Sequence, residues 1–101
     1  MNKPEIATQL EITEFVRSNP EWVFADSALQ AGYVFSDFAD AMRIITLVTK
    51  KIDELDHHPL WSNEYNKVTF ILRTHSCENK VTSLDIALAA SISELVKSQA
   101  G

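Results

Sequence analysis

Apolar residues recur at helical spacing most clearly between Phe38 and Leu55, where they mostly follow one another at steps of three and four. This pattern predicts an amphipathic helix whose single apolar stripe packs into the core. Asp37 precedes the stripe and offers an N-capping oxygen. Because Pro59 restricts the residue before it to extended backbone angles, we expect the helix to end near Leu55.

Weaker periodicity predicts a further helix near each end of the chain. The first is expected to begin at Pro4, because proline lacks only an N–H that the first helical turn leaves unpaired. It should end near Ser18, before Pro20. The last helix follows Thr82–Asp85, a segment with the form of an N-terminal capping box, and is expected to end near Ser98.

Two hairpins are predicted between these helices. Aromatic and β-branched residues run from Trp22 to Phe35, with a turn expected within 29–32, where Gly32 would supply backbone freedom. The second hairpin joins 60–63 to 67–74 through a turn at 64–66. Its second strand has two faces. The face expected to meet the helices carries Val68, Phe70, Leu72 and Thr74, and the other carries Thr69, Ile71, Arg73 and His75.

The predicted element order is therefore α-β-β-α-β-β-α. Two hairpins interleaved with three amphipathic helices predict an α+β fold of two layers, in which a four-stranded antiparallel sheet carries all three helices on one face. The length of 101 residues fits a single domain spanning residues 1–101, large enough to bury a continuous core.

Composition and charge narrow the class of partner. The formal net charge is −5 and the nine basic residues do not cluster, which argues against nucleic-acid binding. No apolar run approaches the length that spans a bilayer, so no membrane association is expected. The single cysteine cannot form an internal disulfide, which fits a cytoplasmic location.

The three histidines of the chain lie between positions 57 and 75 and are the main candidates for chemistry. Histidine exchanges a proton near neutral pH, so His57, His58 and His75 could together supply an acid and a base. His57 and His58 follow a predicted helix C-terminus, whose partial negative charge favours imidazolium. Asp53 lies four residues before His57 and could turn its carboxylate toward that ring.

Other interpretations of the neighbouring residues stay open. Asp85 is more simply the reciprocal member of a helix cap than a catalytic group. Trp61 could stack on a planar ligand, although a tryptophan in a strand is more often part of a core or an interface. Cys77 lies two residues after His75, but no third group that would orient a Cys-His dyad is evident.

A zinc site built from the three imidazoles is a sharper competitor. Zinc enzymes use such sets with one open coordination position. Adjacent histidines on an extended backbone point in different directions, which makes convergence of His57 and His58 on one ion awkward.

The motifs resemble the pterin-4a-carbinolamine dehydratase family over nearly the whole chain. The acid-x-x-x-His-His-Pro signature, combined with a later Thr-His and an aspartate, is highly specific. The family fold is a four-stranded antiparallel sheet with three helices on one side. The residues that carry the resemblance are Asp53 to Pro59, Trp61, Tyr65 to Val68, Thr74, His75, Thr82 and Asp85, with Trp22 and its hairpin.

The resemblance implies dehydration of 4a-hydroxytetrahydropterin to quinonoid dihydropterin and water, in tetrahydrobiopterin recycling, without a metal or another cofactor. His57 and His75 would then be the acid and the base, His58 would position the pterin, and Asp53 and Asp85 would support the histidines. The expected substrate-binding residues are Asp56, His57, His58, Trp61, Arg73, Thr74, His75 and Ser76.

Two further expectations come from the same resemblance. Family members associate as homodimers or homotetramers, and an exposed strand edge or the Trp22 hairpin could mediate this. Animal members also serve as dimerisation cofactors of a homeodomain transcription factor, so a non-catalytic protein-binding module is the alternative function. The chain departs from the family at 78–80, where a glycine is usual. Asn79 tolerates the left-handed conformation and could replace it.

Overall fold

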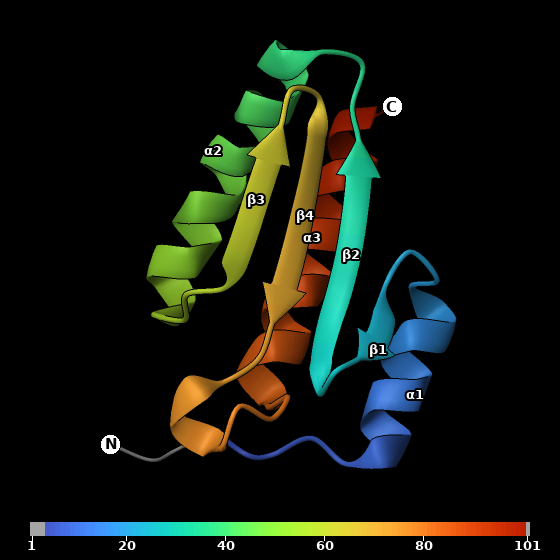
Figure 1. Cartoon of the computed structure of the whole chain (residues 1–101), viewed down its shortest axis with the longest axis vertical. Coiled ribbons are helices and arrows are strands. Elements are labelled where there is room, and N and C mark those ends of the chain that lie inside the picture. The colour runs from blue at the N-terminus through green and yellow to red at the C-terminus, as the bar shows by residue number, and fades with distance from the viewer. Residues whose placement is uncertain (1–3, 101) are drawn as a thin grey trace.

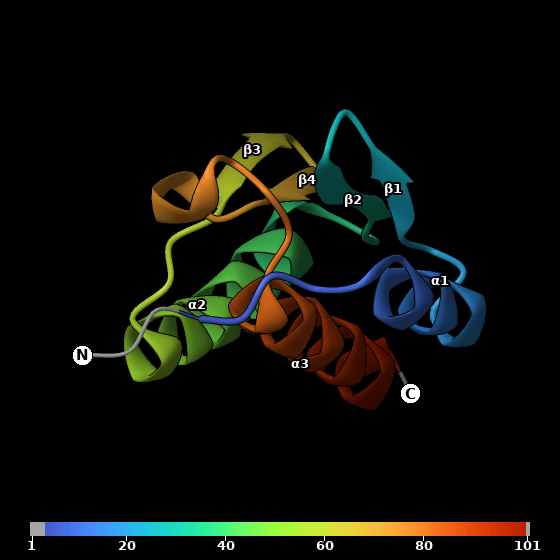
Figure 2. The same cartoon turned by 90° about the horizontal axis from the view of Figure 1, so that it is seen from below.

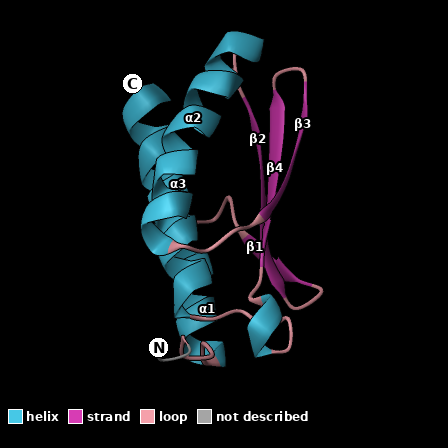
Figure 3. Ribbon diagram, turned by 90° about the vertical axis from the view of Figure 1, so that its left-hand side faces the viewer, coloured by secondary structure: helices cyan, strands magenta, loops and turns pink. Residues whose placement is uncertain are grey.

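Over residues 4–100, which a computed structural model describes, the fold has two layers: a four-stranded antiparallel sheet and three helices packed on one face of it (Figures 1 and 3). This confirms the predicted α+β class and element order. The elements are α1 (Gln9–Ser18), β1 (Val23–Ala25), β2 (Ala28–Val34), α2 (Phe38–Leu55), β3 (Leu60–Glu64), β4 (Lys67–Leu72), the short 3₁₀ helix η1 (His75–Cys77) and α3 (Ser83–Ala100).

The sheet joins the two hairpins through its central strands. Its strand order is β1-β2-β4-β3, and β2 pairs with β4 from Leu29 opposite Leu72 to Val34 opposite Lys67. Along β4, Val68, Phe70 and Leu72 are fully buried, which confirms the face predicted to meet the helices. The hydrophobic effect thus fixes the register of this strand, because a slip by one residue would turn these side chains to solvent.

The core between the layers contains an aromatic cluster whose tryptophan is hydrogen-bonded to the Ser93 hydroxyl. Trp22 is fully buried and its ring packs edge-on against Phe15 and Tyr33. The indole Nε1–H donates to Ser93 Oγ on α3 at 2.8 Å, and that hydroxyl donates to Glu21 Oε2 at 2.6 Å. Burial raises the pKa of Tyr33 to about 12, and its hydroxyl lies 3.4 Å from Ser93 Oγ. Trp22 is therefore a core residue.

The first helix begins later than predicted, at Gln9 instead of Pro4. Thr8 Oγ1 accepts the Glu11 N–H at 3.1 Å, and Glu11 Oε1 accepts the Thr8 N–H at 2.9 Å, so a complete capping box sets the start. The residues before it run extended across the start of α3, where the Ser83 N–H donates to Glu5 O at 2.8 Å (Figure 2). These contacts outweigh the helix-start preference of proline.

The first hairpin turns at Asp26 and Ser27, not within 29–32 as predicted. Both residues have positive φ, of 52° and 61°, as the mirror-image turns of two-residue hairpins require. Gly32 instead lies in β2 without a positive φ. The turn was predicted near Gly32 because glycine is a common turn residue. In the structure, the register of the sheet fixes the turn at Asp26 and Ser27 instead.

Within residues 4–100, every helix is too short or insufficiently apolar to cross a lipid bilayer.

Substitutions on the two sides of this hairpin should separate the observed turn from the predicted one. Ser27→Gly removes the strain of a left-handed serine and should raise the free energy of unfolding by about 0.5–1 kcal/mol. Gly32→Ala should leave it unchanged or raise it slightly, because the added Cβ would meet its nearest atom, Thr69 Oγ1, at an ordinary 3.8 Å. Urea unfolding measures both; a destabilised Gly32→Ala variant would contradict the observed turn.

Candidate active site

His57 is placed by the way in which α2 ends. Asp56 adopts the left-handed conformation, with φ of 48°, and its N–H donates to Asp53 O at 3.2 Å. The N–H of His57 donates to Ile52 O, also at 3.2 Å. Aspartate tolerates this conformation better than most residues, so Asp56 stops the helix and turns the chain toward β3. The helix thus ends where the sequence pattern placed it.

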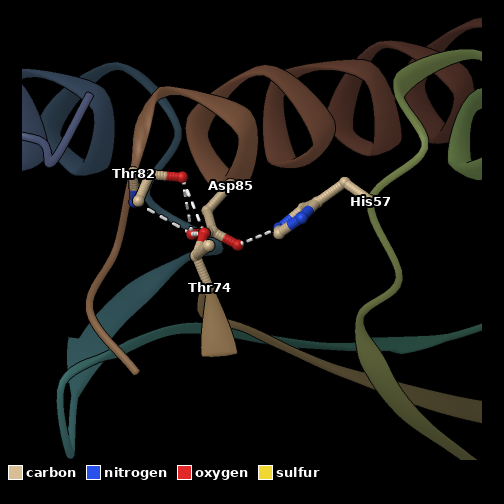
Figure 4. A network of polar contacts seen from close by, with 4 residues as sticks. All are labelled: His57, Thr74, Thr82 and Asp85. Carbon is tan, nitrogen blue, oxygen red and sulfur yellow. Dashed lines mark hydrogen bonds and ion pairs between the residues drawn. The ribbon is translucent and has the colours of Figure 1, made fainter. Parts of the chain in front are cut away.

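The His57 ring pairs with a carboxylate from the start of α3. His57 Nε2 lies 2.5 Å from Asp85 Oδ1, and the two residues are 8% and 0% exposed (Figure 4). A carboxylate without solvent contact must be matched by donors within the protein. His57 Nε2 therefore carries a hydrogen, and Nδ1 is the nitrogen left for other partners.

The second oxygen of Asp85 is held by two threonines. Asp85 Oδ2 accepts the Thr74 hydroxyl at 2.7 Å and the backbone N–H of Thr82 at 2.9 Å (Figure 4). The two threonine hydroxyls lie 2.7 Å apart. The contact with the Thr82 N–H is the reciprocal half of the predicted capping box, so Asp85 caps α3 as expected. The same carboxylate also pairs with His57, so cap and histidine partner are not alternatives here.

This network brings three distant segments together at one end of the molecule. His57 follows α2, Asp85 belongs to the first turn of α3, and Thr74 follows β4. His75 comes directly after Thr74 and opens η1. In Figures 1 and 2, η1 and the C-terminal end of α2 lie at the same end of the fold. Asp85 and Thr74 thus link the His57 ring to the backbone segment that carries His75.

His75 itself is exposed and is held by a residue of its own loop. Its Nδ1 lies 3.2 Å from Asn79 Oδ1. Asn79 and its neighbour Glu78 both have φ of 59°, so Asn79 takes the left-handed conformation expected from its type. The N–H of Thr74 donates to Lys80 O at 2.9 Å and closes the loop.

The acidic residues near His57 and His58 do not make the contacts that their spacing along the helix predicts. Asp53 is exposed, and the carboxylate that contacts His57 comes from Asp85. His58 is largely exposed, with Nε2 3.8 Å from Asp56 Oδ1. The helical spacing did offer Asp53 to His57, but the left-handed turn at Asp56 directs the ring to α3 instead.

The remaining expected site residues have mixed environments. Trp61 is half-buried and packs against Phe70, with ring centroids 6.2 Å apart. Arg73 is half-buried and Ser76 is exposed. Thr74 is 4% exposed, its hydroxyl is held by Asp85 and its N–H donates to Lys80 O. Its carbonyl accepts the Cys77 N–H and is left with one lone pair for a ligand.

Among the described residues, the side chains form neither of the two rival sites, the Cys-His dyad and the metal site. Cys77 is buried and its thiol faces Pro4 O at 3.9 Å, not a histidine. Over residues 4–100, no three His, Cys, Asp or Glu side chains converge in a group that could hold a metal ion.

A separate cavity of about 400 Å³ lies toward the opposite end of α2. It has aromatic walls from Tyr33 and Phe35, and its polar rim includes an ion pair of Asp40 with Arg43 at 2.8 Å. The Ser36 hydroxyl and the Arg43 guanidinium hold the pKa of Asp40 below its ordinary value. These polar groups satisfy one another, so we place the candidate site at the histidines, where acid-base groups are available.

Comparison with known proteins identifies the family of the chain. A family model described as Pterin 4 alpha carbinolamine dehydratase matches residues 5–95. The chain belongs to this family. The resemblance read from the sequence is therefore confirmed, and with it the expectation of an enzyme family of the hydro-lyase class.

The relatives match along most of their length. A candidate pterin-4-alpha-carbinolamine dehydratase of Prochlorococcus marinus is 33% identical over 88 residues, which cover 87% of this chain and 92% of the relative. One from Brucella ovis is 39% identical over 84 residues, covering 81% and 86%. A crystal structure of a transcriptional coactivator/pterin dehydratase from Brucella melitensis has a TM-score of 0.83 at 35% identity and covers 90% of this chain and 98% of its own.

The polar network around Asp85 was only partly foreseeable. The Thr82–Asp85 spacing signals a helix cap, but nothing in it points to His57, which is 28 residues away in sequence. The role of the Thr74 hydroxyl was missed as well, because Thr74 was expected to bind substrate. The alternation of β4 provided a signal, since it placed Thr74 on the buried face, where a hydroxyl needs a partner.

Removing the Thr74 hydroxyl should destabilise the fold. Thr74→Val keeps the shape but deprives the buried Asp85 carboxylate of one donor, which should lower the free energy of unfolding by about 1–3 kcal/mol. Thr74→Ser retains the donor and should lose less. Urea unfolding of the two variants beside the parent protein measures the difference; equal stabilities for Val and Ser would show that the hydroxyl contributes nothing.

Proposed function

We propose that this chain, acting as a single domain, dehydrates a 4a-hydroxytetrahydropterin to quinonoid dihydropterin and water. The observation that carries the proposal is the buried His57–Asp85 pair, linked through Thr74 to the segment after β4 that bears His75. Two imidazoles with different surroundings, one buried and one exposed, suit the opposite tasks of an acid and a base. Family membership supplies the substrate class.

The reaction needs only two proton transfers. A base removes the proton from N5, the N5–H electron pair forms the N5=C4a double bond, and the C4a–O bond breaks. An acid protonates the departing hydroxyl, which leaves as water. No electrons are exchanged with another reagent, so we propose neither a metal nor a cofactor. A pair of positioned histidines can supply both steps.

We assign the acid and base roles to His57 and His75. The Asp85 carboxylate would compensate the positive charge that forms when Nδ1 of His57 holds a proton. His58, which is exposed beside Asp56, would position the pterin. Asp85 takes the supporting role, and Asp53 at most a longer-range electrostatic one. We propose that the pterin is also lined by Asp56, Trp61, Arg73, Ser76 and the backbone carbonyl of Thr74.

Histidine substitutions should reveal this division of roles. His57→Ala and His75→Ala should each lower kcat/KM at least about tenfold, because each removes a group that transfers a proton. His58→Ala should raise KM more than it lowers kcat. The assay follows quinonoid product by absorbance after adding protein to freshly generated 4a-hydroxytetrahydropterin.

Two controls decide between the proposal and its rivals. Circular dichroism should show that the variants remain folded. The assay is repeated with a chelator: acceleration that survives supports the metal-free reaction, and loss of acceleration supports a metal site. An unchanged rate in His75→Ala would remove that residue from the mechanism.

A protein-binding role is the second candidate. It is favoured by the description of the solved Brucella melitensis relative as a transcriptional coactivator as well as a pterin dehydratase. A chain retained only for protein contacts would not accelerate the dehydration at all. The same assay therefore separates the two functions. Only an enzyme would use the buried His57–Asp85 pair to act on a pterin and so accelerate the reaction.

We also propose that the protein forms a homodimer or homotetramer in the cytoplasm, through an exposed strand edge. The edge strands β1 and β3 present apolar side chains: Val23 and Leu60 are 53% and 60% exposed. Trp22 itself is buried and cannot make such a contact.

Light scattering tests the assembly. The parent protein should have a mass of two or four chains. Leu60→Lys or Val23→Lys should shift it toward one chain, because edge lysines oppose strand pairing. If the parent protein has the mass of a single chain, there is no assembly to explain.

A further inference from the structure

The exposed His75 ring raises the question of what holds it in place. A histidine side chain in solvent samples several rotamers, and an acid-base group must stay within hydrogen-bond reach of its substrate. The contact recorded for the ring is between Nδ1 and Asn79 Oδ1, at 3.2 Å. The partner lies four residues later, in the loop that leads toward α3.

The loop is built so that Asn79 returns toward His75. The N–H of Cys77 donates to Thr74 O at 3.0 Å, and the N–H of Lys80 donates to Cys77 O at 3.1 Å. Two successive left-handed residues, Glu78 and Asn79, close the turn. A glycine would meet this backbone requirement at lower cost. The asparagine therefore adds something that the backbone alone does not need, a side-chain amide beside the ring.

The direction of this hydrogen bond selects a tautomer. An amide oxygen can only accept, so Nδ1 of His75 carries the hydrogen and Nε2 keeps its lone pair in the neutral ring. His57 is held the other way round, with Nε2 toward Asp85. The two rings thus have opposite nitrogens free: Nδ1 of His57 and Nε2 of His75.

We propose that Asn79 is a positioning residue for the dehydration, which fixes the orientation of the His75 ring and keeps Nε2 as the nitrogen that exchanges a proton with the pterin. This inference rests on the proposed function. In this proposal Asn79 acts through His75, and no contact between Asn79 and the reacting atoms of the pterin is assigned. Glu78 and Lys80, the charged residues of the same loop, lie 3.9 Å from each other, whereas the contact of the His75 ring is with Asn79.

Three substitutions separate the side chain from the backbone. Asn79→Gly keeps the left-handed conformation and removes the acceptor. Asn79→Asp keeps an acceptor oxygen and adds a negative charge. Asn79→Ala removes the acceptor and also strains the backbone, so it reports stability loss. Thermal unfolding should therefore show Gly and Asp close to the parent protein and Ala below it.

Nitrogen NMR of the imidazoles provides a readout that does not depend on activity. In the parent protein the neutral His75 ring, identified by comparison with His75→Asn, should be protonated at Nδ1. In Asn79→Gly it should shift toward the Nε2–H form, and in Asn79→Asp it should return to Nδ1–H. A purely structural role for Asn79 would leave the tautomer unchanged.

Kinetics should follow the NMR result. Loss of one hydrogen bond of ordinary strength should lower kcat/KM of Asn79→Gly about two- to tenfold. Asn79→Asp should recover most of this rate, with the limb of its pH profile that reports His75 moved to higher pH, because the added carboxylate favours the protonated ring. Salt should reduce that displacement.

Failure of this inference and failure of the proposed function would give different results in these experiments. A parent protein that shows the Nδ1–H tautomer but no dehydratase activity would refute the function and leave only a structural contact. An active parent protein whose His75 tautomer and rate are the same in Asn79→Gly would overturn the role of Asn79. An Nε2–H ring in the active parent protein would overturn it as well.

Discussion

The buried carboxylate of Asp85 is the constraint on which this end of the fold depends. An ion without solvent contact is tolerated only when its oxygens are matched by donors, and each hydrogen bond to a charged group contributes about 1.5–3 kcal/mol. Asp85 obtains its donors from the end of α2, the end of β4 and the start of α3. None of these segments can move without leaving a donor or the carboxylate unpaired. The position of His57 is thereby tied to the packing of the whole sheet against its helices.

The same dependence explains how one residue serves both as the cap of α3 and as the partner of His57. A helix cap needs an acceptor at the first turn, and an oriented imidazole needs an acceptor at the nitrogen that does not react. Asp85 has two oxygens and uses Oδ2 for the cap and Oδ1 for His57. Loss of the carboxylate would therefore loosen α3 and free the His57 ring together. Stability and turnover have to be measured side by side for any substitution in this network.

Local patterns predicted the elements well where one physical signal dominated. The stripe of α2 and the alternation of β4 are hydrophobic periodicities, and the structure confirms both. The hairpin turn was misplaced because Gly32 is a strong turn former, while the left-handed pair Asp26-Ser27 is specified by pairing with distant strands. For the site, the family motif predicts the three histidines and gives Asp85 a supporting role. Spacing along one helix offered Asp53 as the partner of His57, whereas the structure has Asp85 in that place. The choice is decided where two helices meet, and spacing along one helix does not record that.

The two histidines of the proposed mechanism differ in how firmly they are held, and the difference follows from their locations. His57 is fixed by a buried ion whose displacement would cost several hydrogen bonds. His75 lies in solvent, where an uncharged amide suffices to bias the ring without locking it. In the proposed mechanism a flat substrate would enter and leave between groups that also exchange protons with water. One rigid and one adaptable imidazole would meet both demands, because the buried ring would define the geometry while the exposed ring would return to its starting protonation state between turnovers.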